Sequence, residues 1–174
     1  MAEYLMGIDA GTGSVRVALF DFRGQNRAYA VAEYGTTYPK NGWAEQSDYE
    51  WFEALKKAIP ECIKKAGIAA DNIAAITCDA TTNTLVYLDE NDTSVRPPIL
   101  WMDVRATEEA SFIDTIREEY DATKFYKPGF RADTMVPKCM WVKKNEPENW
   151  AKTKTIMEFE DWLNWKLTGC LLYT

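Results

Sequence analysis

The chain has 174 residues, of which 47% are hydrophobic and seven are tryptophan, so we expect an ordered fold with an ordinary core. Its formal net charge of -7 argues against binding to nucleic acid or to an anionic membrane, because both favour clustered lysine and arginine. The sequence contains no histidine, which excludes Ser-His-Asp and Cys-His catalysis and metal sites built on imidazole.

The cysteines and the N-terminus indicate the compartment. No C-x-x-C pair is present, which fits a reducing environment better than a disulfide framework or a zinc site. The start MAEYLM has no basic stretch followed by a long apolar run, and no run approaches the roughly 18 apolar residues of a membrane helix. We therefore expect a cytoplasmic protein. The scattered cysteines are Cys62, Cys78, Cys139 and Cys170.

The first third of the chain alternates short apolar runs with turns. Tyr4–Ile8, Val15–Phe20 and Asn26–Thr37 have the composition and alternation of strands, and the turns between them are short. This spacing predicts an antiparallel meander of three strands.

A helix is predicted to begin after Ser47. Ser47-Asp48-Tyr49-Glu50 fits a capping box, apolar residues then recur at helical spacing, and Gly67 is well placed just past the helix end. Pro60 lies inside this helix and should kink it. A capping role for this region explains the carboxylates of Glu45 and Asp48 more simply than an acid-base pair.

The remainder mixes strands and helices. Two strands are predicted over Ile73–Cys78 and Thr84–Leu88, and Pro97–Trp101 leads into a third. No linker or repeat is present, so we place no domain boundary. The order of elements predicts an α/β fold whose mixed sheet opens with the antiparallel meander and is flanked by helices. Helices are predicted over Glu108–Tyr120, Lys138–Asn145 and Phe159–Leu167, and the acidic residues Glu118, Glu119, Glu158 and Glu160 are expected on solvated helix faces.

The stretch Met6–Asp21 carries the first chemical signal. Arg16 stands at the third glycine position of a dinucleotide fingerprint and a strand follows instead of a helix, while a Walker A loop would need Gly-Lys-Ser/Thr. Between two strands, Gly11-Thr12-Gly13-Ser14 can form a backbone nest for phosphate oxygens. Asp9 at its mouth would meet Mg²⁺ through water, and Arg16 either neutralises phosphate charge or only decorates the strand. The alternative is an ordinary glycine-rich hairpin turn.

A resemblance favours the phosphate interpretation. Asp9-Ala10-Gly11-Thr12 with Arg16 resembles the first phosphate motif of the actin, hexokinase and heat-shock ATPase superfamily. The rest of the chain resembles the N-terminal domain of the FGGY carbohydrate kinases, which implies a ribonuclease H-like (actin-like ATPase) fold. The resemblance implies phosphate binding by Gly11, Thr12, Gly13, Ser14 and Arg16 and a metal at Asp9. The supporting stretches, in order, are Gly42–Gln46, Arg96–Arg105, Val136–Lys138 with Trp141, and Trp162–Gly169.

The same resemblance indicates where substrate would bind. In this family the segment matching Cys78–Asn83 and the tryptophan matching Trp101 line the polyol or ketose pocket, and an aromatic face beside short polar groups suits a sugar. Residues 79–84 resemble the D-x-T-x-x-T pattern of ribulokinase-like members, without the Arg-Glu of glycerol kinases or the Met-His-Gly of xylulokinases. This favours a pentulose such as ribulose. The residues implied to bind substrate are Asp79, Thr81, Thr82, Trp101, Asp103 and Arg105.

Two structural alternatives accompany this assignment. Thr81, Thr82 and Thr84 are also ordinary strand formers, and an aromatic such as Trp101 is often a core residue. Asp103 and Arg105 are expected to hold one another as an ion pair that shapes the pocket wall.

The family resemblance implies ATP-dependent phosphorylation of a ketose or polyol hydroxyl, with ATP and Mg²⁺ as cofactors. Its catalytic aspartate and its C-terminal nucleotide-binding domain match nothing here, so residues 1–174 are interpreted as a single, incomplete N-terminal domain, inactive alone. A homodimer is left open. The alternatives are a non-catalytic sugar- or nucleotide-binding protein of the same fold, and a superfamily ATPase that uses hydrolysis to move its domains.

Overall fold

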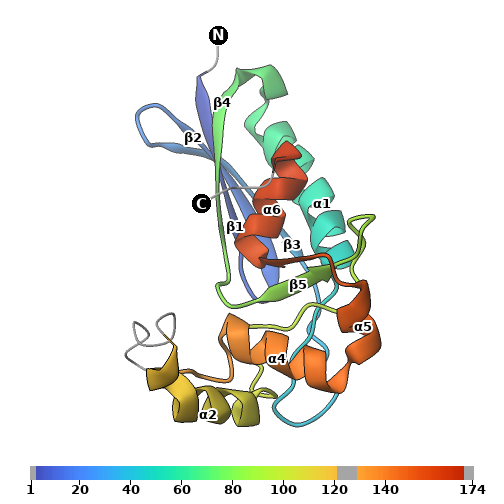
Figure 1. Cartoon of the computed structure of the whole chain (residues 1–174). Helices are drawn as coiled ribbons and strands as arrows, with labels where there is room; N and C mark the ends of the chain where they lie inside the picture. The colour runs from blue at the N-terminus through green and yellow to red at the C-terminus, as the bar shows by residue number, and fades with distance from the viewer. Residues whose placement is uncertain (1–2, 121–128, 171–174) are drawn as a thin grey trace. The chain divides into compact units, whose positions relative to one another are not determined.

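The computed structural model describes residues 3–120 and 129–170. The chain divides into two compact units, coloured along the chain in Figure 1. The prediction of one domain over residues 1–174 stays a prediction, because the compactness of each unit does not test whether they fold together. The first unit comprises Met1–Thr36, Ser47–Thr81 and Glu160–Thr174, and the second comprises Thr37–Gln46 and Thr82–Phe159.

The first unit contains a four-stranded mixed sheet in the order β3-β2-β1-β4. Strand β1 (Tyr4–Ala10) pairs antiparallel with β2 (Ser14–Asp21), and β2 pairs antiparallel with β3 (Asn26–Glu33). Strand β4 (Ile73–Ala80) joins the other edge of β1 in parallel. The predicted mixed sheet with an antiparallel opening is confirmed. The third strand ends at Glu33, four residues earlier than predicted, and Thr37 forms a bridge with Glu45 instead.

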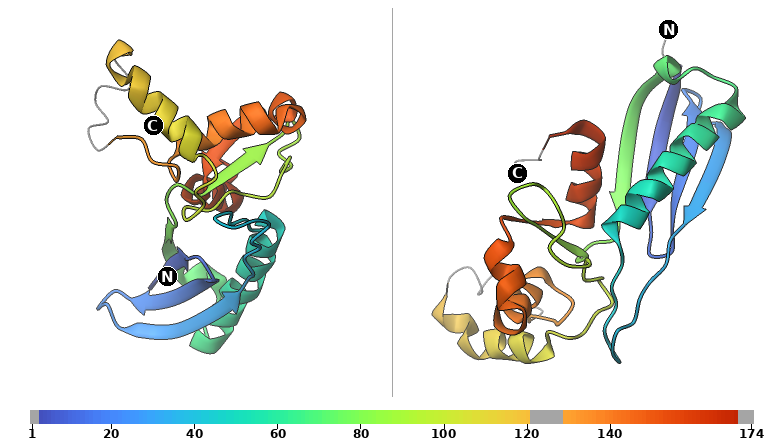
Figure 2. Two further views of the ribbon diagram at one scale, coloured as in Figure 1. Left: turned by 90° about the horizontal axis from the view of Figure 1, so that it is seen from below. Right: turned by 90° about the vertical axis from the view of Figure 1, so that its right-hand side faces the viewer.

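One face of this sheet is covered by α1 (Asp48–Ala66), which packs against β2 and β3 as Figure 2 shows. The alternation predicted for a half-buried strand places Val15, Val17 and Leu19 of β2 in the core. Small alanines of β3 allow the helix to approach closely. The residues buried on that strand are Ala28, Ala30 and Ala32.

The ends of α1 follow the sequence signals. Ser47 Oγ accepts a hydrogen bond from the backbone N–H of Glu50 at 3.4 Å, and Gly67 ends the helix with φ of 67°. The carboxylate of Glu50 accepts from the N–H of Gly35 at 3.3 Å, so it also ties the helix to the chain after β3. Pro60 lies within the helix, as predicted.

Helix α6 (Phe159–Thr168) also contributes to the first unit, and Gly169 follows it with φ of 68°. The indole of Trp162 lies edge-on to that of Trp51, with ring centroids 5.4 Å apart, and both side chains are buried. This contact joins α6 to α1.

The second unit is built on a two-stranded antiparallel sheet of β5 (Leu85–Leu88) and β6 (Thr155–Glu158). Its helices are α2 (Thr107–Ile116), α4 (Met135–Asn145) and α5 (Pro147–Lys152), with a short 3-10 turn, η2 (Arg117–Glu119), after α2. A further 3-10 turn, η1 (Ala70–Asn72), precedes β4 in the first unit. The core of the second unit contains Leu85, Tyr87, Ile99 and Val142.

Several sequence predictions for the second unit need correction. The strand predicted from Pro97–Trp101 is reduced to isolated bridges of Ile99 with Leu85 and Glu45, because the two prolines before it have no N–H for a ladder. The helix predicted to Tyr120 ends at Ile116. Helix α5 and strand β6 were not predicted. Glu158 lies in β6 and accepts a hydrogen bond from Asn83 N–H at 3.2 Å, so its assignment to a solvated helix face was wrong.

Among the described residues, no helix is long and apolar enough to cross a membrane.

Candidate functional site

The uncovered face of the first sheet brings three charged side chains into one row. Asp9 stands opposite Arg16 in the β1/β2 register and opposite Asp79 in the β1/β4 register. Side chains opposite one another in a sheet share a face, so Asp9 lies between a guanidinium and a second carboxylate. The row lies at the carboxyl ends of the parallel strands β1 and β4, where open α/β sheets bind ligands.

Asp9 and Arg16 form an ion pair in solvent. Arg16 Nη1 lies 2.8 Å from Asp9 Oδ2, and both side chains are about half exposed. The hydrogen bond and charge of Asp9 raise the pKa of the Arg16 guanidinium above its usual value. Because both groups remain hydrated, either one can exchange its partner for a ligand at small cost.

The loop after β1 is held in shape by one tyrosine. The Tyr34 phenol donates to the carbonyl of Gly11, and the Tyr34 backbone N–H donates to the carbonyl of Gly13 at 3.2 Å. Burial and the nearby Asp9 raise the pKa of Tyr34 far above its usual value, so its phenol remains a proton donor. Both carbonyls are thereby occupied on the Tyr34 side of the loop.

The glycines of this loop leave room where side chains would interfere. A Cβ at Gly11 would lie 3.2 Å from Arg16 Nη1, tighter than most Cβ contacts, whereas a Cβ at Gly13 would meet nothing within 4 Å. Gly11 therefore lets the guanidinium lie across the loop, and Gly13 leaves the backbone open to an approaching group.

A pocket of about 330 Å³ opens on this face. The charged row of Asp9, Arg16 and Asp79 lies within this pocket. Gly7 adds no side chain to it, and a Cβ at this position would meet nothing within 4 Å. The pocket is lined by Gly7, Ile8, Asp9, Arg16, Ala18, Tyr29, Thr77, Cys78 and Asp79.

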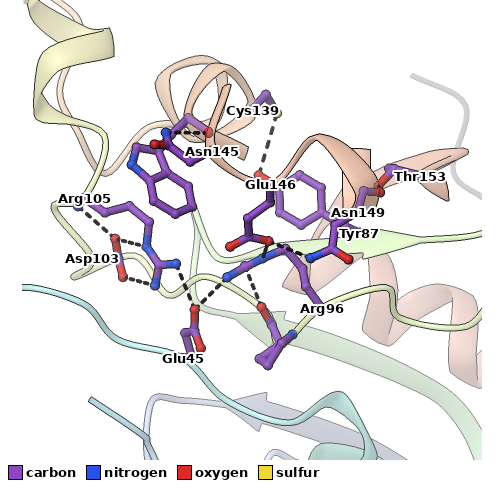
Figure 3. A network of polar contacts seen from close by, with 12 residues as sticks. Glu45, Tyr87, Arg96, Asp103, Arg105, Cys139, Asn145, Glu146, Asn149 and Thr153 are labelled. Atoms are coloured by element: carbon purple, nitrogen blue, oxygen red, sulfur yellow. Dashed lines mark hydrogen bonds and ion pairs between the residues drawn. The ribbon is translucent and has the colours of Figure 1, made fainter. Parts of the chain in front are cut away.

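In the second unit, Asp103 and Arg105 form the predicted ion pair, and both are fully buried (Figure 3). Arg105 Nη2 donates to Asp103 Oδ2 at 2.7 Å and Arg105 Nε donates to Oδ1 at 2.9 Å. The other bonds to this carboxylate come from the backbone N–H groups of Arg105 and Ala44, at 2.9 and 2.6 Å. Since the Asp103 oxygens are occupied within the protein, this carboxylate holds the surrounding chain in place and does not face solvent.

Glu45 joins this pair to a second arginine. Its Oε1 lies 2.6 Å from Arg96 Nη2 and 2.8 Å from Arg105 Nη1, and Figure 3 shows its carboxylate between the two guanidinium groups. Arg96 also donates from Nε to Glu146 Oε2 at 2.8 Å. Glu45 thus binds both ends of the segment from Arg96 to Arg105. The simpler capping explanation for Glu45 was wrong.

Two indoles cover the guanidinium of Arg105. Its Cζ lies 4.0 Å from the ring centroid of Trp43 and 5.0 Å from that of Trp141, and the two rings meet edge-on at 5.1 Å. Cation–π attraction and the carboxylates of Asp103 and Glu45 together offset the cost of burying this charge. Burial lowers the pKa of the Arg105 guanidinium, but the hydrogen bonds and charges of Asp103 and Glu45 outweigh it, so the pKa is raised.

Trp101, at 43% exposed, and Thr82 present their side chains to solvent. Beneath them the ammonium of Lys138 is fully buried and donates to the carbonyls of Asn83 and Leu100 at 2.6 and 2.8 Å. Burial lowers the pKa of Lys138 to about 8, against partial compensation from Asp103, Asp133 and Glu158.

Within the first unit, the structure brings Asp9, Arg16 and Asp79 together beside the glycine loop. The residues implied to bind sugar are divided between the two units. Asp79 and Thr81 belong to the first unit, and Thr82, Trp101, Asp103 and Arg105 belong to the second.

Four supporting residues were not predicted from the sequence, namely Tyr34, Glu45, Arg96 and Lys138. Glu45, Arg96 and Lys138 lie in the stretches that carry the family resemblance, and this position was the signal that could have found them.

The donor set fits a hydrated Mg²⁺ and not a metal held by protein alone. In residues 3–120 and 129–170, no three Asp, Glu or Cys side chains gather in a way that could hold an ion. Asp9 is an exposed carboxylate beside a loop suited to phosphate, and Mg²⁺ keeps several waters while it binds one or two carboxylates and phosphate oxygens.

The fold is that of the sugar kinases with an actin-like ATPase fold. A sequence profile of the FGGY family of carbohydrate kinases, N-terminal domain, matches residues 4–174. The chain belongs to this family.

Individual relatives show which kinases the chain is similar to. The chain is 34% identical over 166 residues to the xylulose kinase of Lactococcus lactis, covering 95% of this chain and 33% of that protein. It is 30% identical over 180 residues to the glycerol kinase of Mycoplasma pneumoniae, covering 96% and 34%. The crystal structure of a xyloylose kinase from Brucella ovis superposes with a TM-score of 0.84 at 27% identity, covering 94% and 34%. The chain therefore spans about a third of the length of these relatives.

Proposed function

We propose that the polypeptide containing this chain transfers the γ-phosphoryl group of ATP to a hydroxyl of a ketose or polyol. One observation carries the proposal: an exposed Asp9 carboxylate lies at the carboxyl end of β1, directly before a glycine loop held by Tyr34. Membership of a carbohydrate kinase family supports it. Phosphoryl transfer depends on positioning and charge stabilisation, which is the chemistry these groups offer.

The first unit is proposed to handle phosphate. Asp9 would hold Mg²⁺ through its water shell, which would supply positive charge beside the phosphate oxygens. The loop Gly11–Ser14 binds phosphate through backbone N–H groups and the hydroxyls of Thr12 and Ser14. If a hydrated cation bound Asp9, the guanidinium of Arg16 would be free to bind an anionic phosphate oxygen.

The sugar-binding roles are proposed unit by unit. In the first unit, Asp79 and Thr81 supply hydrogen bonds to hydroxyls. In the second, Trp101 offers an aromatic face to the C–H groups and Thr82 a hydroxyl. Asp103 and Arg105 act as the buried wall that supports Trp101, and the catalytic base is expected outside residues 1–174.

We propose a five-carbon ketose as the acceptor. The D-x-T-x-x-T pattern of residues 79–84 favours ribulose, whereas the relative at 34% identity is a xylulose kinase. A site built from threonine hydroxyls discriminates by which sugar hydroxyls it can pair, since an unpaired buried polar group is costly.

The test is ADP release by the natural full-length polypeptide with ATP, magnesium and a panel of ribulose, xylulose, ribitol, erythritol and glycerol. Selective turnover of one pentulose is expected. Asp9→Asn should lower kcat by at least about a hundredfold, because a charge-stabilising group at the reacting phosphate is lost. The exposed Asp71 in η1 provides a matched control, and Asp71→Asn should leave kcat unchanged. A folded protein that binds ATP but phosphorylates nothing in the panel would contradict the proposal and favour a binding role.

A further inference from the structure

The side chain of Lys138 connects two separate turns of the second unit. It rises from the first turn of α4 and its Nζ lies 2.6 Å from the carbonyl oxygen of Asn83 and 2.8 Å from that of Leu100. Asn83 lies within the threonine pattern of residues 79–84, and Leu100 directly precedes Trp101. One ammonium therefore binds both segments of the proposed sugar site that lie in this unit.

Each turn is also bound from its other side. The N–H of Asn83 donates to Glu158 Oε2 at 3.2 Å, and the N–H of Trp101 donates to Thr84 Oγ1 at 3.2 Å. The peptide between Leu100 and Trp101 is thus fixed at its oxygen by Lys138 and at its nitrogen by Thr84. Asn83 has φ of 56°, a left-handed conformation that asparagine adopts more readily than most residues other than glycine.

Stability alone does not explain a lysine at this position. The side chain is fully buried, and no ion pair joins it to a carboxylate within residues 3–120 and 129–170. A cation in the first turn of a helix also opposes the helix dipole. A methionine of similar length would fill the same space without a buried charge. What the ammonium adds is hydrogen bonding to two carbonyls at once.

We propose that Lys138 is a positioning residue that sets the indole of Trp101 and the polar turn Thr82–Thr84 in the arrangement that binds the sugar. The inference rests on the proposed sugar kinase function. Lys138 does not touch the sugar in this scheme, and it acts through the carbonyls of Leu100 and Asn83. The predicted consequence is confined to sugar binding, because the phosphate-binding groups Asp9 and Gly11–Ser14 lie in the other unit.

The kinetic experiment compares Lys138→Met with Lys143→Met in the natural full-length polypeptide. Lys143 lies on the same helix but is exposed, so its substitution controls for loss of a charge from α4. In Lys138→Met, KM for the sugar should rise at least tenfold, while KM for ATP and kcat at saturating sugar change less than threefold. A merely structural role would lower the active fraction and leave both KM values unchanged, and that result would overturn the proposal.

Amide hydrogen exchange provides a readout that needs no turnover. In Lys138→Met, the amides of Asn83 and Trp101 should exchange at least tenfold faster than in Lys143→Met, while amides of β1 and β2 stay as protected as before. Unchanged exchange at both positions would refute the role of Lys138 as a clamp. If the unsubstituted protein phosphorylates no sugar but these two amides respond as expected, the proposed function fails and the clamp stands as a structural finding only.

A second variant keeps the test valid if Lys138→Met does not fold. Thr84→Val retains the side-chain shape and removes only the hydroxyl that accepts from Trp101 N–H. It should speed exchange of the Trp101 amide and raise KM for the sugar about threefold, without changing KM for ATP. A sugar KM equal to that of the unsubstituted protein would show that the fixed Leu100–Trp101 peptide has no part in sugar binding, and the proposal would fall.

Discussion

The Asp9–Arg16 pair of the first unit and the Asp103–Arg105 pair of the second have the same chemistry and opposite surroundings. In the first pair the side chains are 52% and 45% exposed, and a single contact of 2.8 Å joins them. In the second, both side chains are 0% exposed, and every acceptor of the carboxylate is bound. The same two residue types are therefore accessible from solvent in one unit and bound into the protein interior in the other.

The difference follows from solvation. An exposed ion pair contributes about 0–1 kcal/mol, because water and salt compete with each partner. A buried pair gains from the low dielectric, but removing one partner leaves an uncompensated charge in the interior. Asp9 can accordingly accept a new partner, whereas Asp103 is committed to Arg105 and Ala44. Four predictions test or sharpen this contrast.

Asp103→Ala should have the largest effect. The substitution leaves the buried Arg105 with Glu45 as its remaining carboxylate and takes the acceptor from the Ala44 N–H, so the free energy of unfolding should fall by about 3–5 kcal/mol. Urea unfolding followed by tryptophan fluorescence measures it. A loss below about 1 kcal/mol would show that the buried pair resembles the exposed one.

Lys138 should make stability depend on pH in the alkaline range. Its pKa is about 8 in the folded protein and 10.5 as a free side chain, so between these values the unfolded chain carries a proton that the folded chain has released. The cost of the buried charge is present below pH 8 and is relieved as pH rises. Between pH 8 and 10.5, the contribution of Lys138 to the free energy of unfolding should grow by up to about 3 kcal/mol.

The measurement for this prediction is urea unfolding at several pH values between 7 and 10.5, for the unsubstituted protein and Lys138→Met. Taking the difference removes the titration of other groups. The charged groups that act on Lys138 are those of Asp103, Asp133, Glu158 and Arg105. A difference independent of pH would mean that the ammonium is better solvated than its burial indicates.

Glu45→Gln should have an intermediate effect. The amide keeps the shape of the side chain but loses the negative charge shared by Arg96 and Arg105, which should lower the free energy of unfolding by about 2 kcal/mol. Glu50→Gln provides a matched control, because the Glu50 carboxylate is exposed and makes one bond of 3.3 Å. Equal losses in the two variants would indicate that the bridge between the two arginines adds nothing.

Asp9→Asn should change stability least. The free energy of unfolding should move by no more than about 1 kcal/mol, and the change should shrink toward zero in 1 M salt, which screens exposed charges. The same salt should leave the effect of Asp103→Ala nearly intact. A large loss of stability in Asp9→Asn would show that the Asp9–Arg16 pair stabilises the fold, and would contradict its proposed role in ligand binding.

The sequence predicted the first unit well because its signals are local. Strand alternation, the Ser47 cap and Gly67 act over a few residues, and the antiparallel hairpins need only short turns. The second unit was predicted less well. Its strands β5 and β6 lie 67 residues apart at Leu88 and Thr155, and four-residue strands carry little periodic signal.

The sequence by itself determined the sheet opening, the placement of Asp9 before a glycine loop, and the family, because each depends on order and spacing along the chain. Only the tertiary structure decided which charges are buried. Glu45 meets Arg96 and Arg105 across 51 and 60 residues, and Lys138 reaches Asn83 across 55. Burial and partnership over such distances set the desolvation of each charge, and desolvation separates a residue that can exchange a partner for a ligand from one that holds the fold.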